Sequence, residues 1–256
     1  MMLCAKSVNG DYQSYIFGGP QSAENRGLIS QRTWRIANPI SVPDIFHRTG
    51  FPQLYELILK LPIIRNIRAQ EQQLIRRILD ENVRAEDEVL EIGAGTGFYS
   101  FEIAKRCREM IALERAPGMA RILARRIACA NVSNIRVREC DFLTYWRETG
   151  FDVVAAIGVL DCIADWRPFL ERCMSLARRQ VIVTVPQESF WGYVYQVFGK
   201  MSRSRVWLAG PEELRHFLQD GSVKIWETGL RTRWTRGLTL VMVIEVETAN
   251  CPQLIR

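Results

Sequence analysis

The sequence predicts an α/β fold in which a mostly parallel β-sheet is covered by helices on both faces. Short apolar stretches alternate with amphipathic stretches of helical periodicity from about residue 87 to residue 186. Such alternation is typical of parallel strands joined by helices. A glycine-rich turn behind the first apolar stretch is the second indication, because turns of this kind join a strand to a helix in parallel sheets.

The chain has 256 residues, which is enough for one large domain with a sizeable core. Residues 1–50 are rich in Gly, Ser, Asn and Pro and have weak periodicity, which predicts an irregular arm. Residues 51–84 have helical spacing with a break at Pro62, which predicts a helical extension. We therefore expect three parts, of which the last, the sheet domain, spans residues 85–248.

The strands and helices of the sheet domain follow from the changes of period. The expected parallel strands are residues 88–92, 109–114, 134–140, 151–158 and 180–186. The expected helices between them are residues 97–107, 116–130 and 166–177. Pro117 fits the first turn of the second helix, where its missing N–H costs nothing.

The last third departs from strict alternation. Residues 189–201 predict an aromatic helix, and residues 211–220 predict a helix that begins with a proline and two acids. Residues 222–234 and 238–247 predict two strands joined by a turn that contains Gly and Arg. We expect these segments to complete the same domain.

The composition is that of an ordinary globular protein, with 48% hydrophobic and 24% charged residues. No apolar run is long enough to cross a bilayer, and the first residues lack the pattern of a secretory signal. The seven cysteines form no CxxC pair, and neither histidine lies near one of them, so no metal site is expected. We expect reduced, mostly buried thiols and a cytoplasmic protein.

The net charge of +6 comes mainly from arginines on expected helix faces. One interpretation is a solvated face with mixed charges, and the other is a footprint for RNA or anionic lipid. The sequence has no ladder of interleaved aromatic and basic residues, which favours the solvated face and disfavours nucleic acid. Peripheral contact with a membrane stays open.

The glycine-rich turn reads GAGTG, from Gly93 through Ala94, Gly95 and Thr96 to Gly97. It lets a ligand approach the backbone closely, and the next helix offers unpaired N–H groups. A dinucleotide would fit such a turn, and so would a nucleoside that carries an amino acid. The dinucleotide fingerprint GxGxxG would need glycine where Phe98 stands.

Glu91 lies two residues before the first glycine, and its charge would repel a phosphate and favour a cationic group. Glu114 ends the second expected strand, at about the 20-residue spacing from which an acid reaches a ribose. A carboxylate accepts two hydroxyl hydrogen bonds well. A solvent-exposed acid at a strand end is the alternative for Glu114.

Further candidates follow the next strands. Met119 has a polarisable side chain that suits an adenine face, or simply the core. Asp141 can accept from an exocyclic amine while the N–H of Phe142 donates to a ring nitrogen, although an N-cap is the alternative for Asp141. Gly158 and Asp161 follow the fourth strand, whose carboxyl end faces the same crevice.

These motifs together resemble the class I S-adenosylmethionine-dependent methyltransferases. The stretches VLEIGAGTG, ALERAPGM, ECDFLTY, FDVVAAIGVLDCIADW and VIVTVP match the family's successive motifs in order, and the resemblance covers about residues 70–246. It implies a Rossmann-like sheet of seven strands, the last antiparallel, and S-adenosylmethionine as cofactor. The Asn-Pro-Pro-Tyr signature of amino-group methylation is absent, and GVLD stands in its place.

The resemblance also implies site residues. Glu91, Gly93 and Gly95 would hold the methionine end of the cofactor, and Ala94 and Gly97 of the same turn would also bind the cofactor. The rest of the cofactor would be held by Glu114, Arg115, Met119, Asp141, Phe142 and Gly158.

The branch most resembled methylates small molecules, which favours O- or C-methylation of an apolar or aromatic acceptor. Residues 44–61 are expected to cover the cofactor, and the aromatic residues of 189–201 either line the acceptor pocket or belong to the core. The candidates for a general base are Asp161, Glu188, His47 and His216, and none stands out. Asp161 follows the fourth strand at the expected crevice, and a structural acid is the alternative for it. An RNA or protein methyltransferase and a cofactor-binding partner module without catalysis are the alternative functions. The sequence does not give the oligomeric state.

Overall fold

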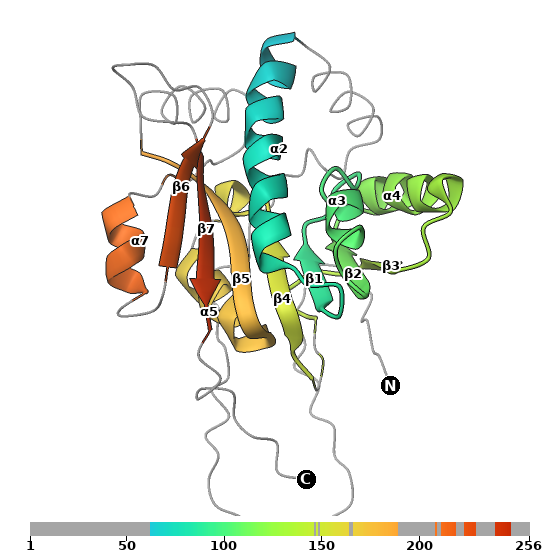
Figure 1. The fold of residues 1–256 in the computed structure, drawn as a ribbon. Helices are drawn as coiled ribbons and strands as arrows, with labels where there is room; N and C mark the ends of the chain where they lie inside the picture. Colours follow the sequence, from blue (N-terminus) through green and yellow to red (C-terminus); the bar gives the residue numbers. More distant parts are fainter. Residues whose placement is uncertain are drawn as a thin grey trace, which may run out of the picture.

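The computed structural model describes residues 62–145, 147, 149–163, 166–188, 208, 211–218, 223–228 and 239–246. The expected arm, the cover at 44–61 and the aromatic segment at 189–201 therefore lie outside the described residues. Most of the described chain is one β-sheet with helices packed against it (Figure 1).

The sheet has seven strands in the order β3-β2-β1-β4-β5-β7-β6. Five of them are parallel: β1 (Glu88–Ile92), β2 (Glu109–Glu114), β3 (Ile135–Glu139), β4 (Phe151–Ala156) and β5 (Ala177–Pro186). β7 (Thr239–Glu245) is antiparallel to β5 and to β6 (Val223–Thr228). The expected Rossmann-like, seven-stranded, mostly parallel sheet is confirmed.

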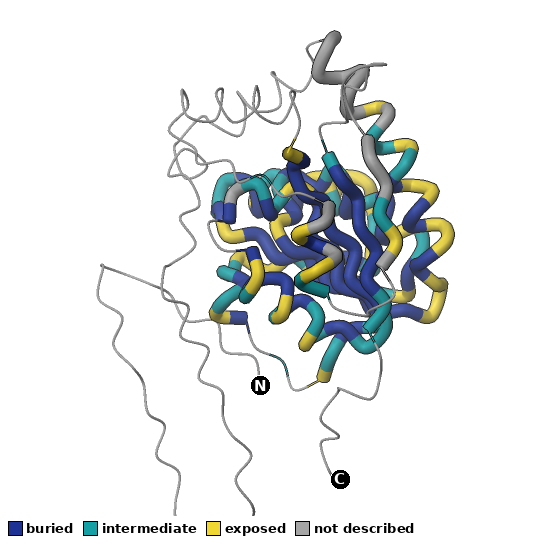
Figure 2. Tube along the Cα trace, turned by 90° about the vertical axis from the view of Figure 1, so that its left-hand side faces the viewer, coloured by how far each residue is buried: buried dark blue, intermediate teal, exposed yellow. Residues whose placement is uncertain are grey.

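Helices cover both faces of the sheet. The helices α2 (Pro62–Asn82), α3 (Ser100–Ala104) and α4 (Pro117–Ala130) share an apolar cluster with one face. The helices α5 (Trp166–Leu176) and α7 (Pro211–Phe217) and the short 3-10 helix η2 (Leu160–Cys162) pack on the other face. Figure 2 shows the buried strands between these layers, with exposed residues along the outer sides of the helices.

The helix α2 begins at Pro62, where a missing N–H is tolerated. Its apolar residues Ile75, Ile78 and Leu79 lie at helical spacing and are almost completely buried, while Arg76 and Arg77 between them are exposed. The side chain of Asn82 ends the helix by donating to the carbonyl oxygen of Ile78, at 2.7 Å. The amphipathic pattern therefore fixes α2 against the sheet by one face.

Several boundaries differ from the sequence prediction. The helix expected at 97–107 is only the five residues of α3, and Gly97 lies outside it because a φ of 90° does not occur in an α-helix. The fifth strand begins at Ala177, three residues early, because Ala177 already pairs with Phe151 of β4. The expected helix at 166–177 ends one residue earlier, at Leu176.

Candidate functional site

The glycine turn occupies the carboxyl end of β1 and has left-handed backbone at each glycine. The φ angles are 69° at Gly93, 58° at Gly95 and 90° at Gly97. A Cβ on Gly93 would lie 2.6 Å from Cγ2 of Val159, whereas a Cβ on Gly95 would meet no atom within 4 Å. A side chain at position 93 would therefore clash with the loop that contains Val159. Gly95 instead borders open space that a ligand can enter.

Hydrogen bonds hold this turn to the second strand. The N–H of Ala94 donates to the carbonyl oxygen of Leu113 (2.9 Å), and the N–H of Gly97 donates to Ala94 (2.9 Å). The N–H of Gly95 donates to Oε2 of Glu114 (2.7 Å). The predicted ribose acid and the glycine turn are therefore in direct contact.

Glu114 is buried at the end of β2. Its second oxygen, Oε1, accepts the N–H of Ala116 at 2.7 Å. Burial raises the pKa of Glu114, although the backbone N–H groups of Ala116 and Gly95 counteract the shift. The alternative of a solvent-exposed acid at a strand end does not hold for this residue.

Glu91 is the second buried acid of this crevice. Its Oε2 accepts a hydrogen bond of 2.6 Å from the hydroxyl of Ser100, in the first turn of α3. The pKa of Glu91 is raised to about 7, mainly because its side chain is buried. The hydrogen bond from Ser100 acts in the opposite direction, and the nearby charge of Glu114 contributes to the rise. Two buried carboxylates beside the glycine turn favour a cation over an anion.

The loop after β3 brings Asp141 and Arg115 together. Oδ1 of Asp141 accepts the N–H of Leu143 at 3.0 Å, and Oδ2 lies 3.4 Å from Nη1 of Arg115. The ring of Phe142 is buried against Phe169, with ring centroids 5.0 Å apart. Only the backbone of Phe142 can therefore face a ligand.

Met119 is 3% exposed in the first turn of α4, so its side chain is part of the core. At the end of β4, Gly158 has a φ of 71° and open space at its Cβ position. Its N–H donates to Oγ1 of the buried Thr184, at 2.6 Å. Asp161 lies in η2 with one carboxylate oxygen buried.

Two side chains in this region were missed by the sequence reasoning. Ser100 bonds the buried Glu91, and Thr184 fixes the loop at Gly158. A buried acid needs a donor, and the residues that follow a glycine turn are the nearest source of one, so Ser100 could have been predicted. Thr184 belongs to a neighbouring strand and gives no comparable local signal.

The other candidates for a general base lie apart. Glu188 and His216 are exposed, and His47 lies outside the described residues. In the part of the chain that the structure describes, no group of three or more acids, histidines and cysteines could hold a metal ion. No described helix is long and apolar enough to cross a membrane.

Of the four cysteines whose surroundings the structure describes, two match the expectation of buried thiols. Cys107 and Cys173 are buried, but Cys129 is exposed and Cys140 is half-buried. Both lie at the edge of the fold, Cys129 on the outer side of α4 and Cys140 just after the edge strand β3, where no further layer covers them. Two arginines of α2 take part in ion pairs, Arg76 with Glu102 and Arg77 with Glu81, which agrees with a mixed, solvated face.

Comparison with known proteins adds independent information. Residues 89–180 match the family model of the methyltransferase domain. A search of curated proteins finds no match. Among solved structures, magnesium protoporphyrin IX methyltransferase (ChlM) from Synechocystis PCC 6803 with bound SAH is similar, with 18% identity and a TM-score of 0.61 over 78% of this chain and 96% of that one.

Two further structures have the same fold. The N-methyltransferase NodS from Bradyrhizobium japonicum WM9, in complex with S-adenosyl-L-homocysteine, is 16% identical, with a TM-score of 0.54 over 73% of this chain and 90% of that chain. The DhpI-SAM-HEP complex is also 16% identical, with a TM-score of 0.56 over 75% of this chain and 91% of that chain. At these identities the likeness concerns the fold.

Proposed function

We propose that this chain, which carries a methyltransferase domain in a class I methyltransferase fold, transfers a methyl group from S-adenosylmethionine to a small organic acceptor. S-adenosylmethionine is the methyl donor of such domains. The observation that carries the proposal is the pair of buried carboxylates, Glu91 and Glu114, beside the bare backbone of Gly95.

The residues fit the cofactor by charge and by space. Glu91 is buried without a charged hydrogen-bond donor and offers its carboxylate to the cationic amino-acid end. Glu114 accepts two backbone N–H groups and can accept two ribose hydroxyls instead or in addition. Gly93, Ala94, Gly95 and Gly97 provide the backbone that lets the ligand approach.

The adenine end belongs to the loops after β2 and β3 in this proposal. Asp141 accepts from the exocyclic amine and the N–H of Phe142 donates to a ring nitrogen, while Arg115 holds the Asp141 carboxylate in place. Met119 packs beneath the adenine from the first turn of α4, and Gly158 closes the side toward β4.

When bound, the cofactor supplies an activated methyl group on a sulfonium, so the protein needs little covalent chemistry of its own. The chain's residues hold the donor in line with the acceptor and exclude water. In reactions of this kind, such positioning lowers the activation barrier by roughly several kcal/mol. A general base is needed only for an acceptor that must lose a proton. Asp161, in the short helix η2 that follows Gly158, is the candidate for that role.

The acceptor is small and apolar or aromatic in our proposal. The sequence resembles the small-molecule branch, and the similar solved structures include a protoporphyrin methyltransferase and the NodS N-methyltransferase. Arg76 and Arg77, the arginines of α2 whose side chains the structure describes, are both in ion pairs, which supports a mixed, solvated face over an RNA footprint. We also propose a cytoplasmic location, on the basis of the free cysteines.

The test is calorimetric titration with S-adenosylmethionine, S-adenosylhomocysteine and NAD. We expect micromolar binding of both adenosyl ligands and none of NAD. In Glu114→Gln the two adenosyl ligands should bind about 100-fold more weakly, because hydrogen bonds to a charged acceptor contribute about 1.5–3 kcal/mol each. The matched control is Glu109→Gln at the other end of the same strand, where the acid is paired with Arg108 and Arg136 and affinity should not change.

Binding that Glu114→Gln leaves unchanged would refute the site assignment. If neither adenosyl ligand binds, a partner module without catalysis becomes the better interpretation. An RNA methyltransferase would instead show RNA retention that falls steeply with salt.

A further inference from the structure

The helix α2 contacts the segment that directly follows the glycine turn. The hydroxyl of Tyr99 donates to Oε1 of Glu71 on α2, at 2.8 Å. Tyr99 is the N-cap residue of α3 and is 7% exposed, so the hydrogen bond crosses a largely buried boundary. Its ring packs edge-on against Phe98, with centroids 4.9 Å apart.

A second set of contacts joins the same two helices one turn further along. Glu102 of α3 is buried and accepts hydrogen bonds from Arg76 of α2 (3.2 Å) and from Lys105 (3.0 Å). Arg106 donates to Asp80 of α2 at 2.7 Å and also to Glu102 at 3.2 Å. These bonds lower the pKa of Glu102 against the opposing effect of burial, so its carboxylate is ionised and paired.

The contact at Tyr99 differs from the ionic set in its place along the chain. Tyr99 stands between Gly97, the last glycine of the turn, and Ser100, which bonds Glu91. A shift of Tyr99 would therefore move the Ser100 hydroxyl relative to the Glu91 carboxylate. It would also release the backbone of the turn, because its three glycines resist deformation less than any other residues.

We infer that Glu71 and Tyr99 are positioning residues, through which α2 holds the cofactor-binding turn and the Glu91–Ser100 pair in their binding geometry. This inference rests on the proposed function as far as the ligand is concerned, since the turn and Glu91 are the proposed cofactor site. The coupling itself is a property of the ligand-free protein. No contact between α2 and the cofactor is required.

The experiment compares four single variants of the full chain. Tyr99→Phe removes the donor, Glu71→Ala removes the acceptor, and Glu71→Gln keeps an oxygen that can accept. Glu81→Gln is the matched control, because it removes an exposed i,i+4 pair with Arg77 on the same helix. The readouts are hydrogen–deuterium exchange in the absence of ligand and the Kd for S-adenosylhomocysteine.

We expect faster exchange across residues 93–100 in Tyr99→Phe and in Glu71→Ala, with exchange in β4 unchanged. The Kd should rise about fivefold in both, as expected for the loss of one hydrogen bond of about 1 kcal/mol. Glu71→Gln should lie close to the wild type, and Glu81→Gln should equal it. Tyr99→Phe and Glu71→Ala break the same bond from opposite sides, which keeps the test decisive if one of them folds poorly.

Two failures can be told apart. If the wild type binds S-adenosylhomocysteine and neither Tyr99→Phe nor Glu71→Ala changes exchange at 93–100 or the Kd, the inference is overturned. If the wild type binds no adenosyl ligand but exchange at 93–100 rises in both variants, the proposed function fails and the coupling by α2 stands.

Discussion

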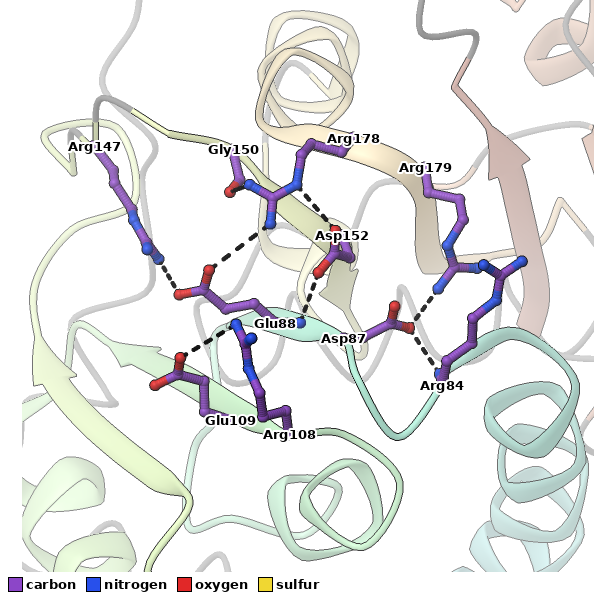
Figure 3. A network of polar contacts seen from close by, with 10 residues as sticks. All are labelled: Arg84, Asp87, Glu88, Arg108, Glu109, Arg147, Gly150, Asp152, Arg178 and Arg179. Atoms are coloured by element: carbon purple, nitrogen blue, oxygen red, sulfur yellow. Dashed lines mark hydrogen bonds and ion pairs between the residues drawn. The ribbon is translucent and has the colours of Figure 1, made fainter.

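The acids at the two ends of the parallel strands accept hydrogen bonds from different kinds of partner. At the amino ends, Asp87 bonds to Arg179, Glu88 to Arg147, and Asp152 to Arg178 (Figure 3). At the carboxyl ends, Glu91 accepts from a serine hydroxyl and Glu114 from backbone N–H groups. Both sets of acids lie on the same strands or next to them, so the difference comes from their partners.

The pKa values follow the partners. For Asp152, burial alone would raise the pKa, but the hydrogen bonds from Arg178 and from the N–H of Glu88 outweigh it and the pKa is lowered. Burial raises the pKa of both Glu91 and Glu114. No cationic side chain among the described residues counteracts this rise. The acids at the amino ends therefore stabilise the fold through ion pairs. The acids at the carboxyl ends remain available to pair with a cationic ligand.

Removing the charge of Glu91 should have the largest effect on stability. The pKa of Glu91 rises to about 7 in the folded state, so its proton is bound more tightly there than in the unfolded chain. The free energy of unfolding therefore falls as the pH rises from about 4.5 to 7, by up to about 3 kcal/mol. Glu91→Gln should be more stable than the wild type by about that amount at pH 8, and hardly different at pH 4.

Urea denaturation at the two pH values measures this gain. Glu88→Gln serves as the control from the amino end, where loss of the charge should lower stability because Arg147 and Arg178 each lose an ion pair with Glu88. A Glu91→Gln variant that is less stable than the wild type at pH 8 would contradict the contrast between the two ends.

Breaking the amino end should cost stability without affecting the ligand. The Asp87 side chain is buried and accepts from the N–H of Arg84, at 2.7 Å, and from the guanidinium of Arg179. Asp87→Ala leaves both donors without this acceptor, and we expect a loss of about 2 kcal/mol, less than for a fully buried pair because Arg179 is partly exposed. Denaturation measures the loss, and calorimetry should give an unchanged Kd for S-adenosylhomocysteine. A weakened Kd at full stability would show that the two ends are not independent.

Proton linkage should connect the ligand end to pH. At pH 7 about half of the Glu91 side chains are protonated in the ligand-free protein, and a cationic ligand favours the ionised half. The Kd for S-adenosylmethionine should therefore fall about tenfold from pH 6 to pH 8, with release of a proton on binding. Calorimetry in two buffers with different ionisation enthalpies measures the proton. The part of the pH dependence that Glu91→Gln abolishes belongs to Glu91, and no change in that variant would exclude this residue as its source.

The fold could be predicted from the sequence because its signals are local. The strands at 88–92 and 109–114 coincide with β1 and β2, since each is a short apolar run bounded by polar residues. The start of α3 could not be read in this way. Its position depends on the positive φ at Gly97, and the apolar pattern of 97–107 contains no information on a backbone angle.

The contacts within the site were predictable only where they follow from strand ends. Glu114 meets the turn at Gly95 because neighbouring parallel strands end at the same edge of a sheet. Thr184 reaches Gly158 from β5 across a pairing that only the folded sheet defines. Glu71 reaches Tyr99 from a helix, and its distance in the chain gives no hint of the contact.

The smallest expected effect distinguishes a neutral hydrogen bond from an ionic one. Thr184 is 2% exposed and accepts the N–H of Gly158, so Thr184→Val should cost about 1 kcal/mol, while Thr184→Ser keeps the oxygen and most of the stability. Because neither partner carries a charge, this loss should be the same at about 0.05 M and about 1 M salt. The loss in Asp87→Ala should shrink over the same range, since the partly exposed Arg179 is screened. If denaturation shows the same salt dependence for Thr184→Val and Asp87→Ala, the two ends of the sheet do not differ in the kind of bond that stabilises them.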